Sequence, residues 1–418
     1  MQLTATDSVV AGVAQKPVSS LPGLSGRVPE LDGLRGIAIG MVLLHHYLFA
    51  LVQADRGTPL AYLLVLGRLT WSGVDLFFVL SGFLIGGILL DARDSANYFR
   101  VFYTRRFFRI VPIYAVSLAG AFTLSSLANL GLAERFAWMF QNQLPWLPQL
   151  FFLQNFWMAQ STNWGSFTLA VTWSLAIEEQ FYLTLPMLVR ILSPRRILAT
   201  LAVGILAAPA LRIALYVLWP EHWLSWHVLM PCRADALLLG VLGAVAMRNP
   251  VCRGWLSRNH RFSSVLLFIL LGGMAVLTWR APDYRHLPML SVGYTWMALF
   301  YLSLLLYSLM YRESWICRCM RWSWLGWLGT IAYGVYLFHE FILGAFFSLL
   351  WSRPPALSSL PEVCVTFLAL ALTLILCRMS WVYFEKPLVQ LGHRSHYLPA
   401  EQRKAHTIAA FAVERSEI

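Results

Sequence analysis

The chain has 418 residues, of which 58% are hydrophobic and 12% are charged, and its mean hydropathy is +0.62. So few charged side chains cannot cover the surface of a water-soluble protein, and the composition therefore excludes a soluble enzyme or binding domain. The formal net charge of +12 could suggest a nucleic-acid partner, but the placement of the arginines described below excludes that class.

Ten apolar runs follow one another along the chain. Most are long enough to cross a hydrocarbon core of roughly 30 Å as a helix. The runs span residues 36–54, 66–90, 111–131, 166–190, 198–218, 233–247, 263–279, 289–310, 325–351 and 362–383. They predict an all-α, polytopic membrane protein with about ten transmembrane helices in one bundle. No long hydrophilic insert interrupts them, so we expect a single membrane domain over residues 29–390.

The two ends of the chain differ from this pattern. Residues 1–28 lack both the basic start and the sustained apolar core of a signal peptide, so we expect a disordered tail there. Residues 391–418 are polar and mixed in charge, and we expect a mobile tail.

The arginines are concentrated on one side of the predicted bundle. If the N-terminus is cytoplasmic, fifteen lie in loops on the cytoplasmic side: Arg93, Arg100, Arg105, Arg106, Arg109, Arg190, Arg195, Arg196, Arg248, Arg253, Arg258, Arg261, Arg312, Arg318 and Arg321. Five lie in the opposite loops: Arg56, Arg135, Arg280, Arg285 and Arg353. The positive-inside rule then predicts a multi-pass protein of the inner (cytoplasmic) membrane with both termini cytoplasmic. The basic charge reflects this topology.

The six cysteines show no CxxC pair and no ligand spacing with histidine. Zinc sites are recognised by paired short spacings of this kind, so we predict no metal site and no disulfide.

Residues 132–165 form the longest outer connection and are rich in Trp, Phe, Gln and Asn. An aromatic belt at the membrane interface, with a re-entrant or interfacial helix, is one interpretation. A surface on which sugar rings stack is the other, because aromatic faces beside amides suit carbohydrates. Both can hold.

The first apolar run contains Arg35, His45 and His46. Polar groups in hydrocarbon are costly unless they are paired or functional. Arg35 and His46 are separated by about three helical turns and share one face, about 16 Å apart along the axis, whereas His45 points about 100° away. His46 is therefore the candidate general base, although a histidine that hydrogen-bonds between packed helices is the alternative.

Further polar residues mark four other segments. Ser81 and Gly82 lie in the second run, where small residues favour helix packing or the close approach of a ligand. Asp75 lies near the outer end of this run and is expected to pair with a neighbouring arginine or to bind substrate. Arg105, Arg106 and Arg109 gather at the cytoplasmic mouth of the third, where their guanidinium groups suit phosphates. Glu178 and Glu179 are adjacent in mid-helix, so at most one is expected to face a cavity. Polar residues also interrupt the later apolar runs, and ion pairs between helices are their simplest explanation. They are Arg233, Asp235, His339, Glu340 and Glu385.

These residues occur in an ordered series of segments that resembles acyltransferase family 3. The segments are LDGLRGIAIGMVLLHHY, GVDLFFVLSGFLIGG, YTRRFFRIVPIY, TWSLAIEEQFYL, CRADALLLG, IAYGVYLFHE and WVYFEKPL. The series extends from Leu31 to Leu388, nearly the whole chain. The family comprises integral-membrane bacterial enzymes that O-acylate surface polysaccharides, peptidoglycan, lipid-linked sugars and some secondary metabolites.

The resemblance assigns roles to individual residues. The family has an arginine that is followed, after ten residues, by a histidine, and these correspond to Arg35 and His46. Its basic RxxR element corresponds to Arg106 and Arg109. The carboxylate of its SLxxE stretch corresponds to Glu178. In its SYxxYLxH element His339 matches, but Ala332 stands where serine is usual. The chain resembles the stand-alone form, without an esterase-like domain after the membrane part.

The resemblance also implies the reaction. An acyl group, expected to be acetyl, would pass from cytoplasmic acyl-CoA to a hydroxyl of a carbohydrate or glycolipid, with no permanently bound cofactor. Arg105, Arg106 and Arg109 would clamp the phosphates of CoA. His46 would deprotonate the acceptor or relay the acyl group, with Glu178 orienting its imidazole. Arg35, or backbone N–H groups near Ser81 and Gly82, would stabilise the oxyanion.

Two other interpretations remain open at this point. In a transporter or flippase, Arg35, Glu178 and His339 would form a proton or substrate path, although the chain lacks the internal repeats that many transporters show. An inactive structural member of the family is the third possibility, and the intact motif residues argue against it.

Overall fold

The computed structural model describes residues 28–52, 64, 67–281 and 285–399. Every regular element in this part of the chain is a helix, so the predicted all-α fold is confirmed. Arg56 lies outside the described residues, and so do residues 1–27 and 400–418. Of the two predicted tails, the structure therefore describes only Val28 and residues 391–399.

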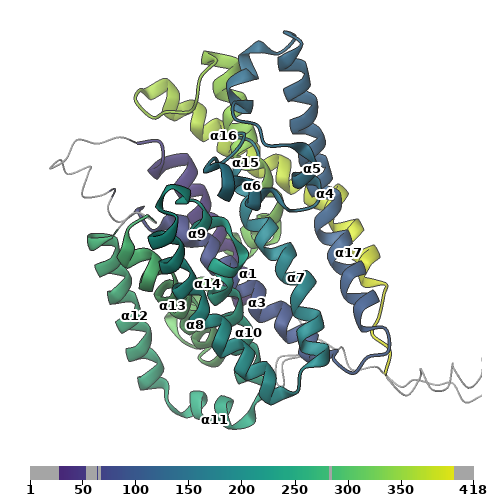
Figure 1. Ribbon diagram of the computed structural model, residues 1–418, viewed down its shortest axis with the longest axis vertical. Coiled ribbons are helices and arrows are strands. Elements are labelled where there is room, and N and C mark those ends of the chain that lie inside the picture. Colours follow the sequence, from purple (N-terminus) through teal and green to yellow (C-terminus); the bar gives the residue numbers. More distant parts are fainter. Residues whose placement is uncertain (1–27, 53–63, 65–66, 282–284, 400–418) are drawn as a thin grey trace, which may run out of the picture.

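Long helices build the bundle, and short ones connect them (Figure 1). The long helices are α1 (Pro29–Leu44), α3 (Gly73–Asp91), α4 (Tyr98–Asn129), α7 (Trp173–Ile191), α8 (Pro194–Leu218), α10 (Met230–Arg248), α12 (His260–Arg280), α13 (Tyr294–Met310), α15 (Ser323–Trp351) and α16 (Leu360–Ser380). The short ones are η1 (His45–Phe49), η2 (Thr70–Ser72), η3 (Glu134–Phe140), α5 (Trp146–Leu150), α6 (Gln154–Ser161), η4 (Ala170–Thr172), η5 (Pro220–His222), α9 (Ser225–Val228), α11 (Pro250–Arg258), η6 (Met289–Gly293), α14 (Trp315–Met320), η7 (Trp381–Glu385) and α17 (Lys386–His393).

Each of the ten predicted apolar runs coincides with one of the long helices. Within the described residues, eight helical spans are long and apolar enough to cross a membrane. The helices α1 and α7 are not among these eight spans. Helix α1 has 16 residues, carries Arg35 and is followed by His45 and His46 in η1, whereas α7 carries Glu178 and Glu179, which lower its mean hydropathy. The two helices that depart from simple membrane composition are thus those that hold the candidate catalytic residues.

Glycines bring the central helices into backbone contact. A Cβ atom added at Gly82 of α3 would lie 1.9 Å from the carbonyl oxygen of Leu237 in α10, and one at Gly36 of α1 would lie 2.2 Å from that of Leu325 in α15. Hydrocarbon gives no hydrophobic drive between helices, so close packing of small residues holds such a bundle together. These contacts place α3 against α10 and α1 against α15.

The two ends of the bundle differ. The connection over residues 132–165 folds into η3, α5 and α6, and α11 lies at the opposite end (Figure 1). The helical run of α16 continues through η7 into α17, and α17 packs against α4 (Figure 1). Arg105 donates two hydrogen bonds to the carbonyl of Ser395, at 2.7 and 3.1 Å. Residues 391–399, which were expected to open the mobile tail, are therefore held against α4.

Candidate functional site

A cavity of about 520 Å³, here named the histidine cavity, contains the candidate base. Its lining includes His45, His46, Glu340, Trp71, Trp138, Gln141, Asn142, Trp164, Trp173, His227, Arg233, Val74 and Tyr336. The loop that follows α4 thus contributes Trp138, Gln141, Asn142 and Trp164, the side-chain types on which a sugar-stacking surface was predicted. The volume lies in the range of small-ligand sites.

Helix α1 changes its winding where the histidines lie. From His45 to Phe49 the backbone forms the π-helical turn η1, and such turns occur frequently at functional sites. His45 was expected to point away for packing, but both histidines line the cavity, and their rings stand edge to face at 5.0 Å between centroids. The cavity therefore borders two neighbouring faces of the helix at η1.

His46 has two partners on α15. Its Nδ1 lies 3.2 Å from Nε2 of His339, and its Nε2 lies 3.4 Å from a carboxylate oxygen of Glu340. His339 and Glu340 are buried, and His46 is partly exposed toward the cavity. This trio of His46, His339 and Glu340 joins η1 to α15.

Backbone carbonyls decide which ring nitrogens carry protons. Nδ1 of His339 lies 2.9 Å from the carbonyl of Tyr336 and 3.0 Å from that of Val335, so it is the donor and its Nε2 is an acceptor. Nδ1 of His46 faces the carbonyl of Val42 at 3.0 Å and also Nε2 of His339, so it too is protonated. This leaves the lone pair on Nε2 of His46 beside Glu340.

The trio has the residue types of a metal site. Among the described residues, His46, His339 and Glu340 form the group whose potential ligand atoms all lie within 4.8 Å of one another. The hydrogen bonds already use Nε2 of His339, which leaves His46 and Glu340 as available ligands. Catalytic zinc sites use three protein ligands, so the donor set fits a hydrogen-bonded base better than a metal ion.

A second cavity, of about 320 Å³, is here named the arginine cavity. Its lining includes Arg35, Arg106, Arg109, Glu178, Ser81, Tyr182, Tyr333, Ala332, Val74 and Tyr336. Within it Tyr182 donates to Glu178 at 3.2 Å and pairs with the Ser81 hydroxyl at 2.6 Å. The candidate phosphate-binding arginines and the carboxylate of the SLxxE stretch thus share one chamber.

A third hollow, of about 680 Å³, opens beside the arginine cavity and shares Arg35, Arg109 and Gly329 with it. Arg321, Arg378 and Lys386 add further positive charge to its lining. Arg35 is paired here with Asp32 at 2.9 Å. Arg105, which was expected to bind the donor, lines none of these cavities; it holds Ser395 and lies over the ring of Tyr397.

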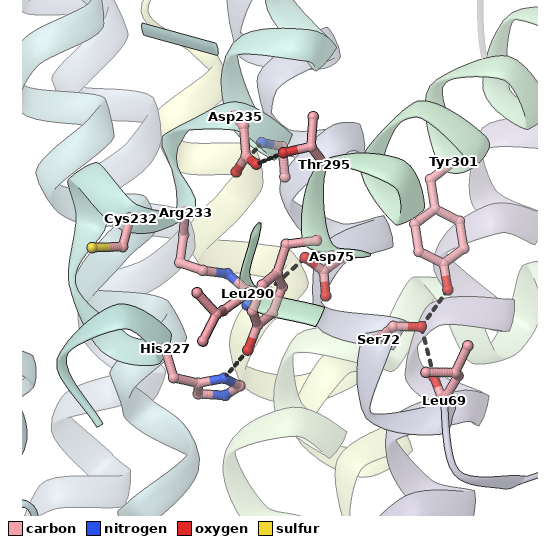
Figure 2. A network of polar contacts seen from close by, with 12 residues as sticks. Leu69, Ser72, Asp75, His227, Cys232, Arg233, Asp235, Leu290, Thr295 and Tyr301 are labelled. Atoms are coloured by element: carbon pink, nitrogen blue, oxygen red, sulfur yellow. Dashed lines mark hydrogen bonds and ion pairs between the residues drawn. The ribbon is translucent and has the colours of Figure 1, made fainter. Parts of the chain in front are cut away.

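The polar residues of α10 form buried ion pairs (Figure 2). Arg233 bonds Asp75 of α3 at 2.6 Å, and Arg212 of α8 bonds Asp235 at 2.9 Å. Asp235 also accepts a hydrogen bond from Thr295 of α13 at 2.6 Å. These interactions connect α3, α8, α10 and α13. Ion pairs between helices are also what the sequence predicted most simply for Arg233 and Asp235. Arg233 also lines the histidine cavity.

The structure changes three of the expected roles. His46 and Glu178 line different cavities, and the carboxylate beside His46 is that of Glu340. Arg35 lines the arginine cavity, about 16 Å along the helix from His46, too far to stabilise an oxyanion formed there. Gly82 packs against Leu237, so its backbone serves helix packing.

Sequence reasoning missed several residues of the site. Glu340 was noticed but assigned to helix stitching, although its position next to His339 was a usable signal. Tyr182 and Tyr336 were not singled out, because nothing in one sequence distinguishes a buried tyrosine at a cavity from one that only packs. The pairing of His46 with His339 spans 293 positions in the chain, so only the fold could reveal it.

Comparison with known proteins gives a consistent result. Residues 28–380 match acyltransferase family 3, described as an acyltransferase domain. The chain is 28% identical over 397 residues to YrhL of Bacillus subtilis, covering 88% of this chain and 56% of that protein. It is 25% identical over 388 residues to the peptidoglycan O-acetyltransferase OatA of Listeria monocytogenes, covering 88% and 57%.

A third relative is the acyltransferase MdmB of Streptomyces mycarofaciens, with 31% identity over 249 residues, 54% of this chain and 59% of that protein. The chain thus spans a little over half the length of the curated relatives it matches. No solved structure is significantly similar to it.

Proposed function

Because the chain belongs to acyltransferase family 3, we propose that it transfers an acyl group from acyl-CoA to a hydroxyl of a carbohydrate. The observation that carries the proposal is the adjacency of two chemically different cavities. The arginine cavity suits an anionic donor, the histidine cavity contains a base among aromatic and amide side chains, and the two meet at Val74 and Tyr336.

The donor end of the proposal rests on charge. CoA carries a pyrophosphate and a further phosphate, and Arg106 and Arg109 present guanidinium forks that match such groups. Arg35 adds a third guanidinium on the same chamber. The arginine-rich loops are expected to be cytoplasmic, so the donor would enter from the cytoplasm, and the protein would act in the cytoplasmic membrane.

The chemistry follows from the tautomers of the trio. The Nε2 lone pair of His46 takes the proton of the acceptor hydroxyl, and the resulting alkoxide oxygen attacks the thioester carbonyl. The carbon–sulfur bond then breaks, CoA leaves as the thiolate, and the proton on His46 neutralises it. While His46 is an imidazolium, the Glu340 carboxylate at 3.4 Å stabilises it, and His339 holds its Nδ1 side.

The acceptor is a saccharide of the cell envelope in this proposal. All three relatives carry acyltransferase or acetyltransferase names, and those from Bacillus subtilis and Listeria monocytogenes are named for peptidoglycan. In this chain, Trp138 and Trp164 with Gln141 and Asn142 supply ring faces and amides to the histidine cavity. Stacking on indole and hydrogen bonds from amides are the contacts that a sugar ring uses.

The test uses membranes that contain the full chain, incubated with acetyl-CoA labelled in its acetyl group. We expect labelled, alkali-labile ester in the membrane glycans, and a loss of roughly 100-fold or more with His46→Ala, since a general base contributes about 10²- to 10⁴-fold. His260→Ala in α12 is the matched control and should keep most of the activity, because His260 lines none of the three cavities. A transporter would form no ester in any of these membranes, and full activity of a correctly inserted His46→Ala variant would contradict the assigned base.

A further inference from the structure

Two residues separate the two cavities. Of all the residues that line the arginine cavity, Val74 and Tyr336 are those that also line the histidine cavity. Val74 lies in the first turn of α3, and Tyr336 lies in the middle of α15. Each keeps only 9% of its surface exposed, so together they form a wall with one chamber on either side.

Tyr336 is held rigidly in this wall. Its hydroxyl donates to the carbonyl of Val171 at 2.8 Å and pairs with the hydroxyl of Ser174 at 2.5 Å. Its ring stands edge to face against Phe77 of α3, with 6.4 Å between centroids. A tyrosine fixed at both its ring and its hydroxyl cannot swing aside without losing these contacts, so the wall between the cavities keeps a defined position.

The order of residues along α15 shows what must cross the wall. Gly329 lines the arginine cavity, Tyr336 lines both cavities, and Glu340 lines the histidine cavity. The steps along the axis are about 10 Å and about 6 Å. The guanidinium groups of the arginine cavity therefore lie on one side and His46 on the other, so a thioester held by those arginines would meet the base only at the wall.

We propose that Val74 and Tyr336 form a size filter for the acyl group, which admits the acetyl thioester and excludes longer chains. The inference rests on the proposed function and deepens it, because it names the donor as a short acyl-CoA. A closed apolar aperture discriminates between chains that differ by one methylene by about 10- to 200-fold. Enlarging the aperture should therefore relax the preference without touching the base or the arginines.

The experiment compares acetyl-, propionyl-, butyryl- and hexanoyl-CoA. The dissociation constant of each is measured on the purified full chain in lipid nanodiscs, and acyl transfer is measured in membranes. For Tyr336→Ala and Val74→Ala we expect the butyryl-to-acetyl ratio of transfer rates to rise about 10-fold or more, and the butyryl-to-acetyl ratio of dissociation constants to fall by about the same factor. Tyr336→Phe keeps the ring but loses both hydroxyl hydrogen bonds, and its ratio should lie between those of the wild type and Tyr336→Ala.

Leu84→Ala is the matched control, since Leu84 lines the arginine cavity but not the wall, and it should leave the ratio unchanged. If Tyr336→Ala does not fold, Val74→Ala alone decides, together with Val74→Leu, which should retain acetyl-CoA binding and lose transfer. An unchanged ratio in folded, active Tyr336→Ala or Val74→Ala would overturn the filter and leave the proposed function intact. Failure of the wild-type chain to bind any acyl-CoA or to form ester would overturn the proposed function itself, and the filter with it.

Discussion

At the scale of single residues, the site depends on which side chains stand beside His46. A histidine in hydrocarbon is useful as a base only if its protonated form is stabilised at the moment it appears. Glu340 is placed for this, and Glu178 is not, because Glu178 lies in the arginine cavity with Tyr182. In the proposed reaction the two carboxylates therefore have different roles.

Glu340→Gln should lower kcat and leave the KM for acetyl-CoA nearly unchanged. A hydrogen bond to a charged group contributes about 1.5–3 kcal/mol, which corresponds to roughly 10- to 150-fold in rate. The interaction with imidazolium forms only during the reaction, so its loss appears in kcat. Steady-state kinetics of acetyl transfer in membranes provide the measurement.

Glu178→Gln is the matched control for that variant, and its effect should fall on the KM for acetyl-CoA. Glu178 contacts Tyr182 and shares its chamber with Arg106 and Arg109. If both variants lowered kcat alike while donor binding stayed the same, Glu340 would not be the specific partner of His46.

At the scale of elements, backbone geometry positions these side chains. Both histidines of the π-helical turn η1 line the cavity, and the contact of α1 with α15 through Gly36 brings His46 to His339. Likewise α3 reaches α10 because Gly82 and Gly240 leave room for backbone on backbone. The position of the wall residue Val74 depends on this second contact, since it belongs to α3.

Gly82→Ala should destabilise the protein, because the added Cβ would lie 1.9 Å from the carbonyl oxygen of Leu237. Overpacking of this kind costs about 1–3 kcal/mol. Gly120→Ala in α4 is the control: nothing lies within 4 Å of its added Cβ, and alanine favours the helix. Thermal unfolding in detergent measures both. An unaltered melting temperature for Gly82→Ala would show that α3 and α10 can separate without cost.

At the scale of the whole molecule, the chambers follow one another through the bundle. The hollow beside Arg35 and Arg109 joins the arginine cavity, and Val74 and Tyr336 divide that cavity from the histidine cavity. With the arginine-rich loops on the cytoplasmic side, the order of the chambers would lead from donor to acceptor across the membrane.

This orientation is testable by labelling with a membrane-impermeant maleimide. Cys252 in α11 is exposed and lies among arginines, so we expect it to react only after the membrane is opened. A cysteine introduced as Ser358→Cys, between α15 and α16, should react in intact cells. The protein used to label Cys252 has Cys319 and Cys364 replaced by serine. The protein with Ser358→Cys has the same two replacements and also has Cys252 replaced by serine. The reverse labelling pattern would place the arginines outside.

The sequence by itself determined the class of the protein and many of its chemical groups. Hydropathy requires helices in hydrocarbon because each backbone polar group must be satisfied within its own segment, and the apolar runs therefore coincide with the long helices. Periodicity and the ordered motifs selected Arg35, His46, Arg106, Arg109 and Glu178, all of which line the cavities.

Only the tertiary structure decided which of these groups act together. The pairing of His46 with His339 and Glu340, the separation of His46 from Glu178, and the wall of Val74 and Tyr336 each join residues from different helices. Helical periodicity assigns a residue to a face of its own helix, but the neighbour of that face is set by packing between helices far apart in the chain. For that reason the base could be named from sequence, whereas its carboxylate partner could not.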